Sequence, residues 1–318
     1  MSLPHTFYAA TFAGALPAPE GSTCEFSNTF TNAGQIGRTG PSQSQINQAY
    51  SDVTVTNGIQ EWIVPCTSTY SITVAGASAD GTRKGLGAII KGEFYLTEGD
   101  TIKIIVGQQG TLEGEPQHND MSSSGGGGSF VWNSNIGTPS SSNTPLIAAG
   151  GGGGGSGIVG NHTGTNASYS TSGALGTGGC PGSGGTSGGA GAPGGCDGNW
   201  WDGTGGAGWH QDSVTSGQNS GLGAPPVSVA NGAVGGLGHY QSTVEGVGGF
   251  GCGAGATGDG IWGVGGGGGG YSGGGGGGNT GTDSDRGSGG GGGSYNNGQN
   301  TTTLGYQTGH GYVIIETL

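Results

Sequence analysis

From residue 25 to residue 106 the chain is a series of short segments rich in β-branched residues, each bounded by turn-forming residues. Such segments are typical of strands in an antiparallel sandwich or jelly roll. In one of them Tyr70, Ile72 and Val74 alternate with Ser71 and Thr73, and this period of two places the first set on one buried face. The expected strand segments are EFSNTF, SDVTVTN, IQEWIVPC, TYSITVAGA, GAIIKGEFYLTEGD and TIKIIVGQQG.

A turn and three later strands complete this pattern. Glu98-Gly99-Asp100 separates two strand segments and predicts a hairpin-like turn. Later strands are expected in SFVW, PLIAA and the C-terminal GYVIIETL, the last of which is expected to return and close the sheet. The predicted class is therefore all-β, a β-sandwich with its strands in about residues 24–110, 129–149 and 311–318.

Runs of glycine interrupt the strands, in residues 125–128 and within about residues 150–310. One interpretation is a flexible linker, because glycine-rich chains behave as random coils. The alternative is polyglycine II, a left-handed helix with three residues per turn and no internal hydrogen bonds, whose backbone groups must all bond to neighbouring helices. The later runs occupy residues 150–155, 265–270, 273–278 and 289–293.

Two features favour the ordered alternative. Apolar or aromatic residues stand at the ends of the runs, as in LIAAGGGGGG, IWGVGGGGGG and GGGGSFVW, and a solvated linker has no need of such anchors. The chain also holds six tryptophans, which is too many large aromatic side chains for a solvated low-complexity segment. A bundle of polyglycine II helices fused to the sandwich is therefore expected.

Composition excludes several other classes of protein. The 318 residues include 85 glycines, and only 30% of residues are hydrophobic and 8% charged, so helix is close to excluded because glycine costs about 1 kcal/mol in a helix interior. Collagen is excluded as well, since the 12 prolines accompany no strict Gly-X-Y period. No apolar run reaches the length of a transmembrane helix, so no membrane insertion is expected.

The charge balance bears on partners. Six Lys and Arg against 19 Asp and Glu give a formal net charge of −13. Nucleic-acid binding is not expected, because it needs a basic stripe to neutralise phosphates. An acidic surface attracts cationic partners at a distance, although acidity that only keeps a glycine-rich chain soluble remains an alternative.

Few residues suggest metal or catalytic chemistry. The five cysteines form no CxxC pair, and the six histidines form no HExxH motif. A calcium site at Asp259, Asp283 and Asp285 is left open, although the repeated calcium-binding pattern is missing. No nucleophile elbow or P-loop is present. The prediction is a protein that is not an enzyme and that has no cofactor.

Other candidate sites concern the surface. Sequons at Asn161, Asn166 and Asn300 predict N-glycosylation if the chain is exported. Trp200, Trp201 and Trp209 lie in a glycine-rich stretch and are candidates for contact with a sugar or protein partner. The alternative for these tryptophans is that they cap the glycine layer.

Specific sequence elements resemble the membrane-proximal, glycine-rich domain of the anaplastic lymphoma kinase and leukocyte tyrosine kinase receptor family. GIQEWIVP at residues 58–65 and GQQG at residues 107–110 are far more specific than the glycine runs. The resemblance extends over about residues 24–318. Its other elements are GPSQSQ, QAY, YSI, AGA, GLG, LTEGD, GGGGSFV, LIAAG, GGF, GGGGGGY and HGYV.

This resemblance implies a tumour-necrosis-factor-like sandwich fused to polyglycine II helices, a unit that binds small basic helical cytokines in the receptors. No kinase, growth-factor-like module or transmembrane segment accompanies it here. The cysteine positions match the receptors loosely. The resemblance therefore leaves two disulfide pairings to be tested, Cys24 with Cys66 and Cys180 with Cys252.

Two functions follow as expectations. The first is a structural or adhesive surface protein, a subunit of a filament, surface layer or virion that contacts a host or protein partner or its own copies. The alternative is a secreted or ectodomain ligand-binding module that captures a basic polypeptide, as in the resembling receptors. Salt dependence separates the two, because electrostatic capture weakens as ionic strength rises.

The organisation and location of the chain are the last expectations. Residues 1–23 read as an N-terminal arm that docks on a neighbouring subunit, and residues 24–318 as one composite domain. The arm has no basic region or continuous apolar core and does not read as a signal peptide. The expected location is nevertheless extracellular or on a particle surface.

Overall fold

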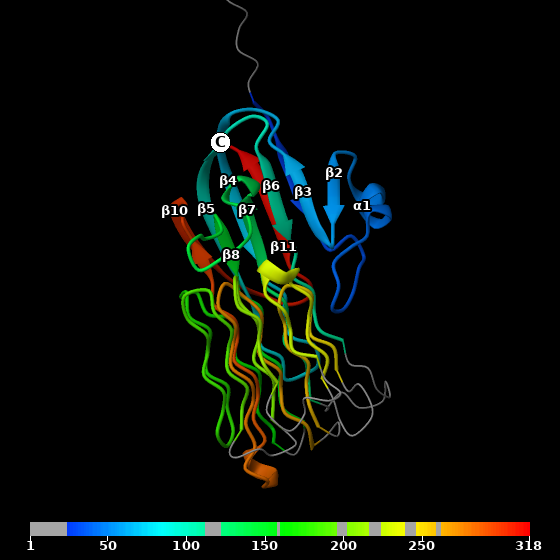
Figure 1. Cartoon of the computed structure of the whole chain (residues 1–318), viewed down its shortest axis with the longest axis vertical. Coiled ribbons are helices and arrows are strands. Elements are labelled where there is room, and N and C mark those ends of the chain that lie inside the picture. Colours follow the sequence, from blue (N-terminus) through cyan, green and yellow to red (C-terminus); the bar gives the residue numbers. More distant parts are fainter. Residues whose placement is uncertain are drawn as a thin grey trace, which may run out of the picture.

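The computed structural model describes residues 24–111, 122–157, 160–195, 202–215, 224–238, 246–258 and 262–318. The proposed arm, residues 1–23, lies outside them. Figure 1 shows an elongated molecule with the strands gathered at one end and glycine-rich segments running side by side at the other. The C-terminus lies at the strand end (Figure 1).

Two antiparallel sheets form a sandwich at the strand end. The first sheet has the order β1-β11-β4-β5-β10, and the second has the order β2-β3-β6-β7-β8-β9. The first contains β1 (Ser27–Phe30), β4 (Ser68–Ala75), β5 (Gly87–Leu96), β10 (Gln299–Gln307) and β11 (Tyr312–Thr317). The second contains β2 (Val53–Thr56), β3 (Ile59–Ile63), β6 (Thr101–Ile105), β7 (Ser129–Asn133), β8 (Ile147–Ala149) and β9 (Tyr295–Asn296).

The alternation along β4 places its apolar side chains in the core between the two sheets. Tyr70, Ile72 and Val74 are fully buried there, as the sequence pattern predicts. Ile102 and Ile104 of β6 face them from the second sheet as members of the same core cluster. The C-terminal strand β11 pairs with β1 and β4, which confirms that the end of the chain closes the first sheet.

A second apolar cluster covers the outer face of the second sheet. Along β7, Val131 belongs to the core between the sheets, whereas Phe130 and Trp132 belong to this second cluster. Trp209 and Phe250, from the glycine-rich part of the chain, pack in the same cluster. Both faces of the second sheet are therefore buried along β7 and β8, and the second cluster joins the sandwich to the glycine-rich segments.

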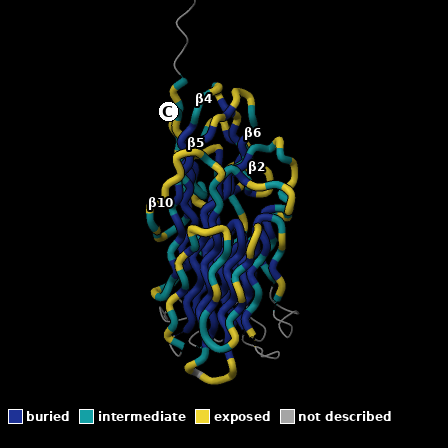
Figure 2. The backbone as a smooth tube through the Cα atoms, turned by 90° about the vertical axis from the view of Figure 1, so that its left-hand side faces the viewer, coloured by how far each residue is buried: buried dark blue, intermediate teal, exposed yellow. Residues whose placement is uncertain are grey.

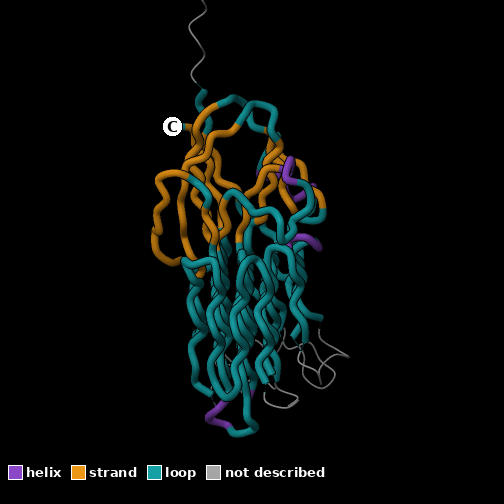
Figure 3. The backbone as a smooth tube through the Cα atoms, turned by 60° about the vertical axis from the view of Figure 1, so that its left-hand side comes forward, coloured by secondary structure: helices purple, strands orange, loops and turns teal. Residues whose placement is uncertain are grey.

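The glycine-rich segments, which we call the glycine body, are held together by lateral backbone hydrogen bonds. The amides of Gly151, Gly152 and Gly153 donate to three different neighbours, the carbonyls of Gly269, Ala77 and Thr165. The amide of Gly154 then returns to the first neighbouring segment, at Gly266. Figure 3 shows these segments as loops that run alongside one another below the strands, and Figure 2 shows that their interior is buried.

Four features differ from the sequence predictions. An α-helix, α1 (Gln43–Ala49), forms where helix was not expected, because residues 41–57 contain no glycine and Ser42 and Gln45 make a reciprocal capping box. Strands β9 and β10 form within the stretch assigned to glycine helices. The turn at Thr97–Asp100 joins β5 to β6, which lie in different sheets, so it crosses the sandwich and does not form a hairpin.

The short helical turns lie in the connections. They are η1 (Ser134–Ile136), η2 (Val229–Asn231) and η4 (Asp283–Asp285). Within the described ranges, no helix has the length and apolar character needed to cross a lipid bilayer.

Candidate functional site

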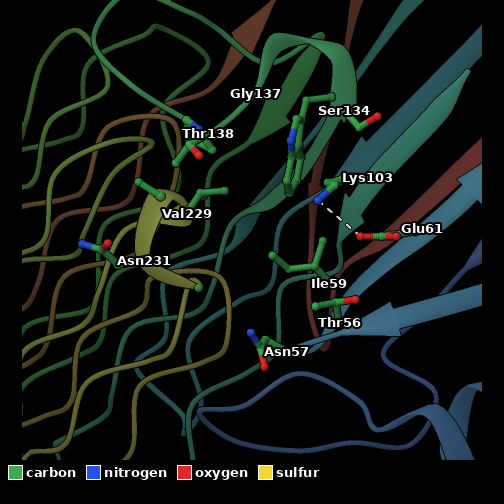
Figure 4. Close-up of a pocket in the computed structure, with 14 residues that line it drawn as sticks. Thr56, Asn57, Ile59, Glu61, Lys103, Ser134, Gly137, Thr138, Val229 and Asn231 are labelled. Atoms are coloured by element: carbon green, nitrogen blue, oxygen red, sulfur yellow. Dashed lines mark ion pairs between the residues drawn. The ribbon is translucent and has the colours of Figure 1, made fainter.

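A groove runs along the boundary between the sandwich and the glycine body. It consists of two hollows, of about 560 Å³ and about 470 Å³, which meet at Asn57, Asn231 and Gly232. We call it the junction groove. Figure 4 shows the larger hollow, with Ile59 and Asn57 on the sandwich side and Val229 and Asn231 on the side of the glycine body.

The sandwich wall of the groove is built by a tight hairpin. Thr56 pairs with Ile59, so that Asn57 and Gly58 form a two-residue loop between β2 and β3. Both loop residues have positive φ, +52° and +80°, which is the conformation of the type I′ turn that Asn-Gly sequences favour. The twist of this turn matches the strands and presents Asn57, which is exposed, at the edge of the groove.

The opposite wall is held in place by a partly buried carboxylate network. The Asp212 carboxylate accepts hydrogen bonds from the Ser228 amide and hydroxyl, each at 2.7 Å, and from the Asn231 side-chain amide at 2.8 Å. Burial alone would raise the pKa of Asp212, but these hydrogen bonds outweigh it and lower the pKa. The ionised carboxylate therefore fixes η2 against the glycine body.

The floor of the groove carries one ion pair. Lys103 Nζ of β6 lies 3.2 Å from Glu61 Oε1 of β3, and Figure 4 shows the two side chains pointing toward each other from these neighbouring strands. Glu61 and Lys103 are the charged residues that line either hollow. No histidine lines either hollow, so neither lining serine, Ser42 or Ser134, has an imidazole beside it in the groove.

A second polar network joins the loop before β11 to the glycine body. The Gln109 amide donates to Nδ1 of His310 at 3.1 Å, and the Gly309 amide donates to the Ser78 hydroxyl at 3.1 Å. Burial lowers the pKa of His310, and Asp80 partly opposes this shift. The imidazole is therefore neutral, as a ring nitrogen that accepts a hydrogen bond must be.

His310 is expected to make the protein less stable as the pH falls. Its folded pKa lies below the unfolded value of about 6.5, so the unfolded state binds more protons. The stabilisation is complete above about pH 6.5 and is lost as the pH falls through the folded pKa. His310→Asn is expected to flatten the pH dependence of the urea midpoint between about pH 5 and pH 7. Parallel curves for the two proteins would refute the assignment.

Of the two disulfide pairings expected from the sequence, the structure confirms one and contradicts the other. Cys24 and Cys66 form a disulfide, as expected. The pairing of Cys180 with Cys252 is wrong, because Cys180 is disulfide-bonded while Cys252 is a free, buried thiol. Burial raises the pKa of the Cys252 thiol well above its usual range. The sequence could not decide this pairing, because the same cysteine spacings are compatible with several disulfide connectivities.

The tryptophan expectations have different outcomes. Trp209 is fully buried, packs against Phe130 and Trp132, and donates its indole N–H to the Asn143 carbonyl at 3.0 Å. The expectation that Trp209 contacts a partner is therefore wrong, because the aromatic side chain serves the second apolar cluster. Trp200 and Trp201 lie outside the described residues.

The sequon asparagines are exposed, and each also makes a side-chain hydrogen bond. Asn161 accepts from the Arg83 side chain, Asn166 accepts from the Leu86 amide, and Asn300 on β10 donates to Glu93. Their glycosylation stays a prediction.

The calcium expectation also stays a prediction. Asp283 and Asp285 lie in η4, and Asp259 lies outside the described residues. In the described part of the chain, no three His, Cys, Asp or Glu side chains come together as metal ligands.

Asp202 is a buried carboxyl in the glycine body. Burial raises its pKa to about 6, and its Oδ1 has no hydrogen-bond partner among the described residues. A perturbed acid is a frequent feature of enzyme sites, but catalysis also needs a second group within reach. Asp202 by itself therefore does not define a reaction.

Comparison with known proteins finds a partial similarity to a receptor. No protein-family model matches the chain. The leukocyte tyrosine kinase receptor of Mus musculus is 36% identical to it over 110 aligned residues. The alignment covers 30% of this chain and 12% of the receptor, so the similarity concerns a small part of the receptor's length.

Proposed function

We propose that this chain is a non-enzymatic, extracellular binding module that captures a basic polypeptide in the junction groove. The observation that carries the proposal is the groove itself, a concave surface between two separately built walls whose lining holds no catalytic pair. The partial similarity to a receptor supports it. The Cys24–Cys66 disulfide is consistent with an oxidising, extracellular compartment.

The proposal includes a finer description of the architecture. The sandwich is a tumour-necrosis-factor-like jelly roll, and the glycine body is a bundle of polyglycine II helices. The hydrogen bonds of residues 151–154 support the second point, because three successive amides reach three neighbours and the fourth returns to the first. That repeat of three residues is the period of polyglycine II, which has no internal hydrogen bonds of its own.

Electrostatics favours a cationic partner. With a formal net charge of −13, the chain attracts basic polypeptides over a distance set by the ionic strength. Within the groove, the Glu61 carboxylate is partly exposed and is paired with Lys103, whose side chain is also partly exposed. The flexible lysine side chain can move away from Glu61. A cationic side chain of the ligand is able to join or replace Lys103 at this carboxylate.

Glu61→Gln is expected to weaken this binding about tenfold, which corresponds to about 1.4 kcal/mol. The substitution keeps the size of the side chain and removes the negative charge from the groove floor. The measurement uses lysine-rich helical peptides as probes, with glutamate-rich peptides of equal length for comparison, from about 50 mM to about 500 mM salt. Binding of the lysine-rich peptides is expected to fall steeply over this range.

The matched control is Glu98→Gln, which removes the same charge from an exposed turn of the sandwich. It is expected to change the affinity less than about twofold, because a distant rim charge is screened. An equal loss in both variants would mean that net charge alone drives binding, and salt-independent binding would exclude electrostatic capture.

The second candidate function is a structural or adhesive surface protein. The dense lateral bonding of the glycine body favours it, since such an array is suited to a rigid spacer. Electron microscopy of the native protein tests this candidate, with filaments or particles as the supporting result. Deletion of residues 1–23 without a change in oligomeric mass would rule out assembly through the arm.

A further inference from the structure

A separate hollow of about 270 Å³ lies beside the edge strands β9 and β10 of the sandwich. It is slightly below the roughly 300 Å³ at which pockets for drug-sized ligands begin, so it has room for a single small ring. Its polar and aromatic walls are Tyr169, Tyr295, Asn296, Thr301, Thr302 and Thr303. No charged residue lines this hollow.

A bulge in β10 accounts for the three consecutive threonines in one wall. Side chains of a regular strand alternate between the two faces of a sheet. The pairing of β10 with β5, however, shifts register between Gln299 and Thr302 and again between Thr303 and Gly305. Such irregularities re-aim side chains. The threonines 301–303 are all exposed, and their hydroxyls have no hydrogen bond to another described residue.

The two tyrosines of the hollow are held in place by neighbouring rings. Tyr169, 36% exposed, stacks on Tyr306 with ring centroids 4.9 Å apart. Tyr295 packs on Tyr271 at 4.6 Å and donates its hydroxyl to Thr144. Burial, and then the neighbouring Tyr306, raises the pKa of Tyr169 to about 12, so its phenol stays neutral. The hollow is therefore preorganised and carries no charge.

We propose that this hollow binds a neutral saccharide unit. A sugar ring presents an apolar face of C–H groups, which packs on an aromatic ring, and a rim of hydroxyls, which need partners that both donate and accept. Tyr169 and Tyr295 supply the rings, and the threonines supply hydroxyls not engaged by described protein groups. The lack of charge disfavours phosphates and other ions. This hollow shares no lining residue with the junction groove, so either binding proposal can be refuted without affecting the other.

The saccharide has two sources to distinguish, a sugar in solution and a glycan carried by the chain itself. Residues 300–302 form the sequon Asn-Thr-Thr, and its second and third residues line the hollow. The full chain is therefore produced both in a host that adds no N-glycans and in one that does. Peptide mapping by mass spectrometry shows whether Asn300 is modified, and separates it from the sequons at Asn161 and Asn166.

The test is saturation-transfer NMR on the unmodified full chain with neutral hexoses, N-acetylhexosamines and their disaccharides. At least one sugar is expected to bind, and Tyr169→Ala and Thr302→Val are each expected to weaken it by about tenfold or more. Tyr95→Ala is the matched control, because Tyr95 is 72% exposed on β5 and outside the hollow. Circular dichroism establishes that each variant is folded.

Two results overturn the proposal: no transfer to any neutral sugar, or binding that neither Tyr169→Ala nor Thr302→Val changes. Binding of free sugar that is lost when Asn300 carries a glycan supports the site and identifies the chain's own glycan as its occupant. Binding that persists in the glycosylated protein supports an external saccharide.

Discussion

Gly127→Ala is expected to destabilise the protein by more than about 3 kcal/mol. A Cβ at this position would overlap the carbonyl oxygen of Phe250. That oxygen accepts the amide hydrogen of Gln108, and Gly127 itself bonds to Gln108 and Ala77. Backbone atoms cannot rotate away as a side chain can, so several lateral hydrogen bonds would have to shift together. Urea unfolding followed by circular dichroism measures the effect.

Gly99→Asn is the control for this prediction. Gly99 has a φ of +86° and nothing within 4 Å of an added Cβ, and asparagine tolerates the left-handed conformation better than most residues. A cost below about 1 kcal/mol is therefore expected. Similar costs for the two substitutions would mean that close packing of the glycine body is not what requires glycine at Gly127.

Trp209→Ala is expected to cost about 3 to 5 kcal/mol, the usual range for removal of a large buried aromatic side chain. Trp209 lies between Phe130 and Trp132, at centroid distances of 6.2 Å and 5.6 Å, and its loss would leave a cavity between the sandwich and the glycine body. The urea midpoint is the measurement.

Trp209→Phe separates packing from hydrogen bonding at this site. It keeps an aromatic ring and loses the hydrogen bond to the Asn143 carbonyl. The lost hydrogen bond is expected to lower the free energy of unfolding by about 1 to 2 kcal/mol, in addition to the loss caused by the smaller ring. An unchanged midpoint for Trp209→Ala would contradict the role of Trp209 as a buried anchor.

The sequence predicted the sandwich well because its strands are local patterns. The alternation in β4 and the β-branched segments of β3, β5 and β6 can be read without knowledge of distant residues. By contrast, β10 was missed because it has only two apolar residues, Leu304 and Tyr306, and both are exposed, so they mark no buried face. The helix α1 was missed because average composition hides a short stretch without glycine.

The candidate site could not be predicted in the same way. Asn57 and Asn231 meet at one groove only because the glycine body packs against the hairpin of β2 and β3, and neither residue carries a motif. The sequence did single out Trp209, but its burial depends on contacts with β7 that are distant in the chain. The pairing state of Cys252 likewise depends on the packing around it.

Hydrogen exchange of the full chain, with and without a bound lysine-rich helical peptide, tests the central proposal most directly. If the junction groove captures basic polypeptides, protection is expected at residues 57–59 of the hairpin and at residues 229–232 of η2, and it is expected to disappear at high salt. Protection confined to other parts of the chain, with these two segments unchanged, would contradict the proposal.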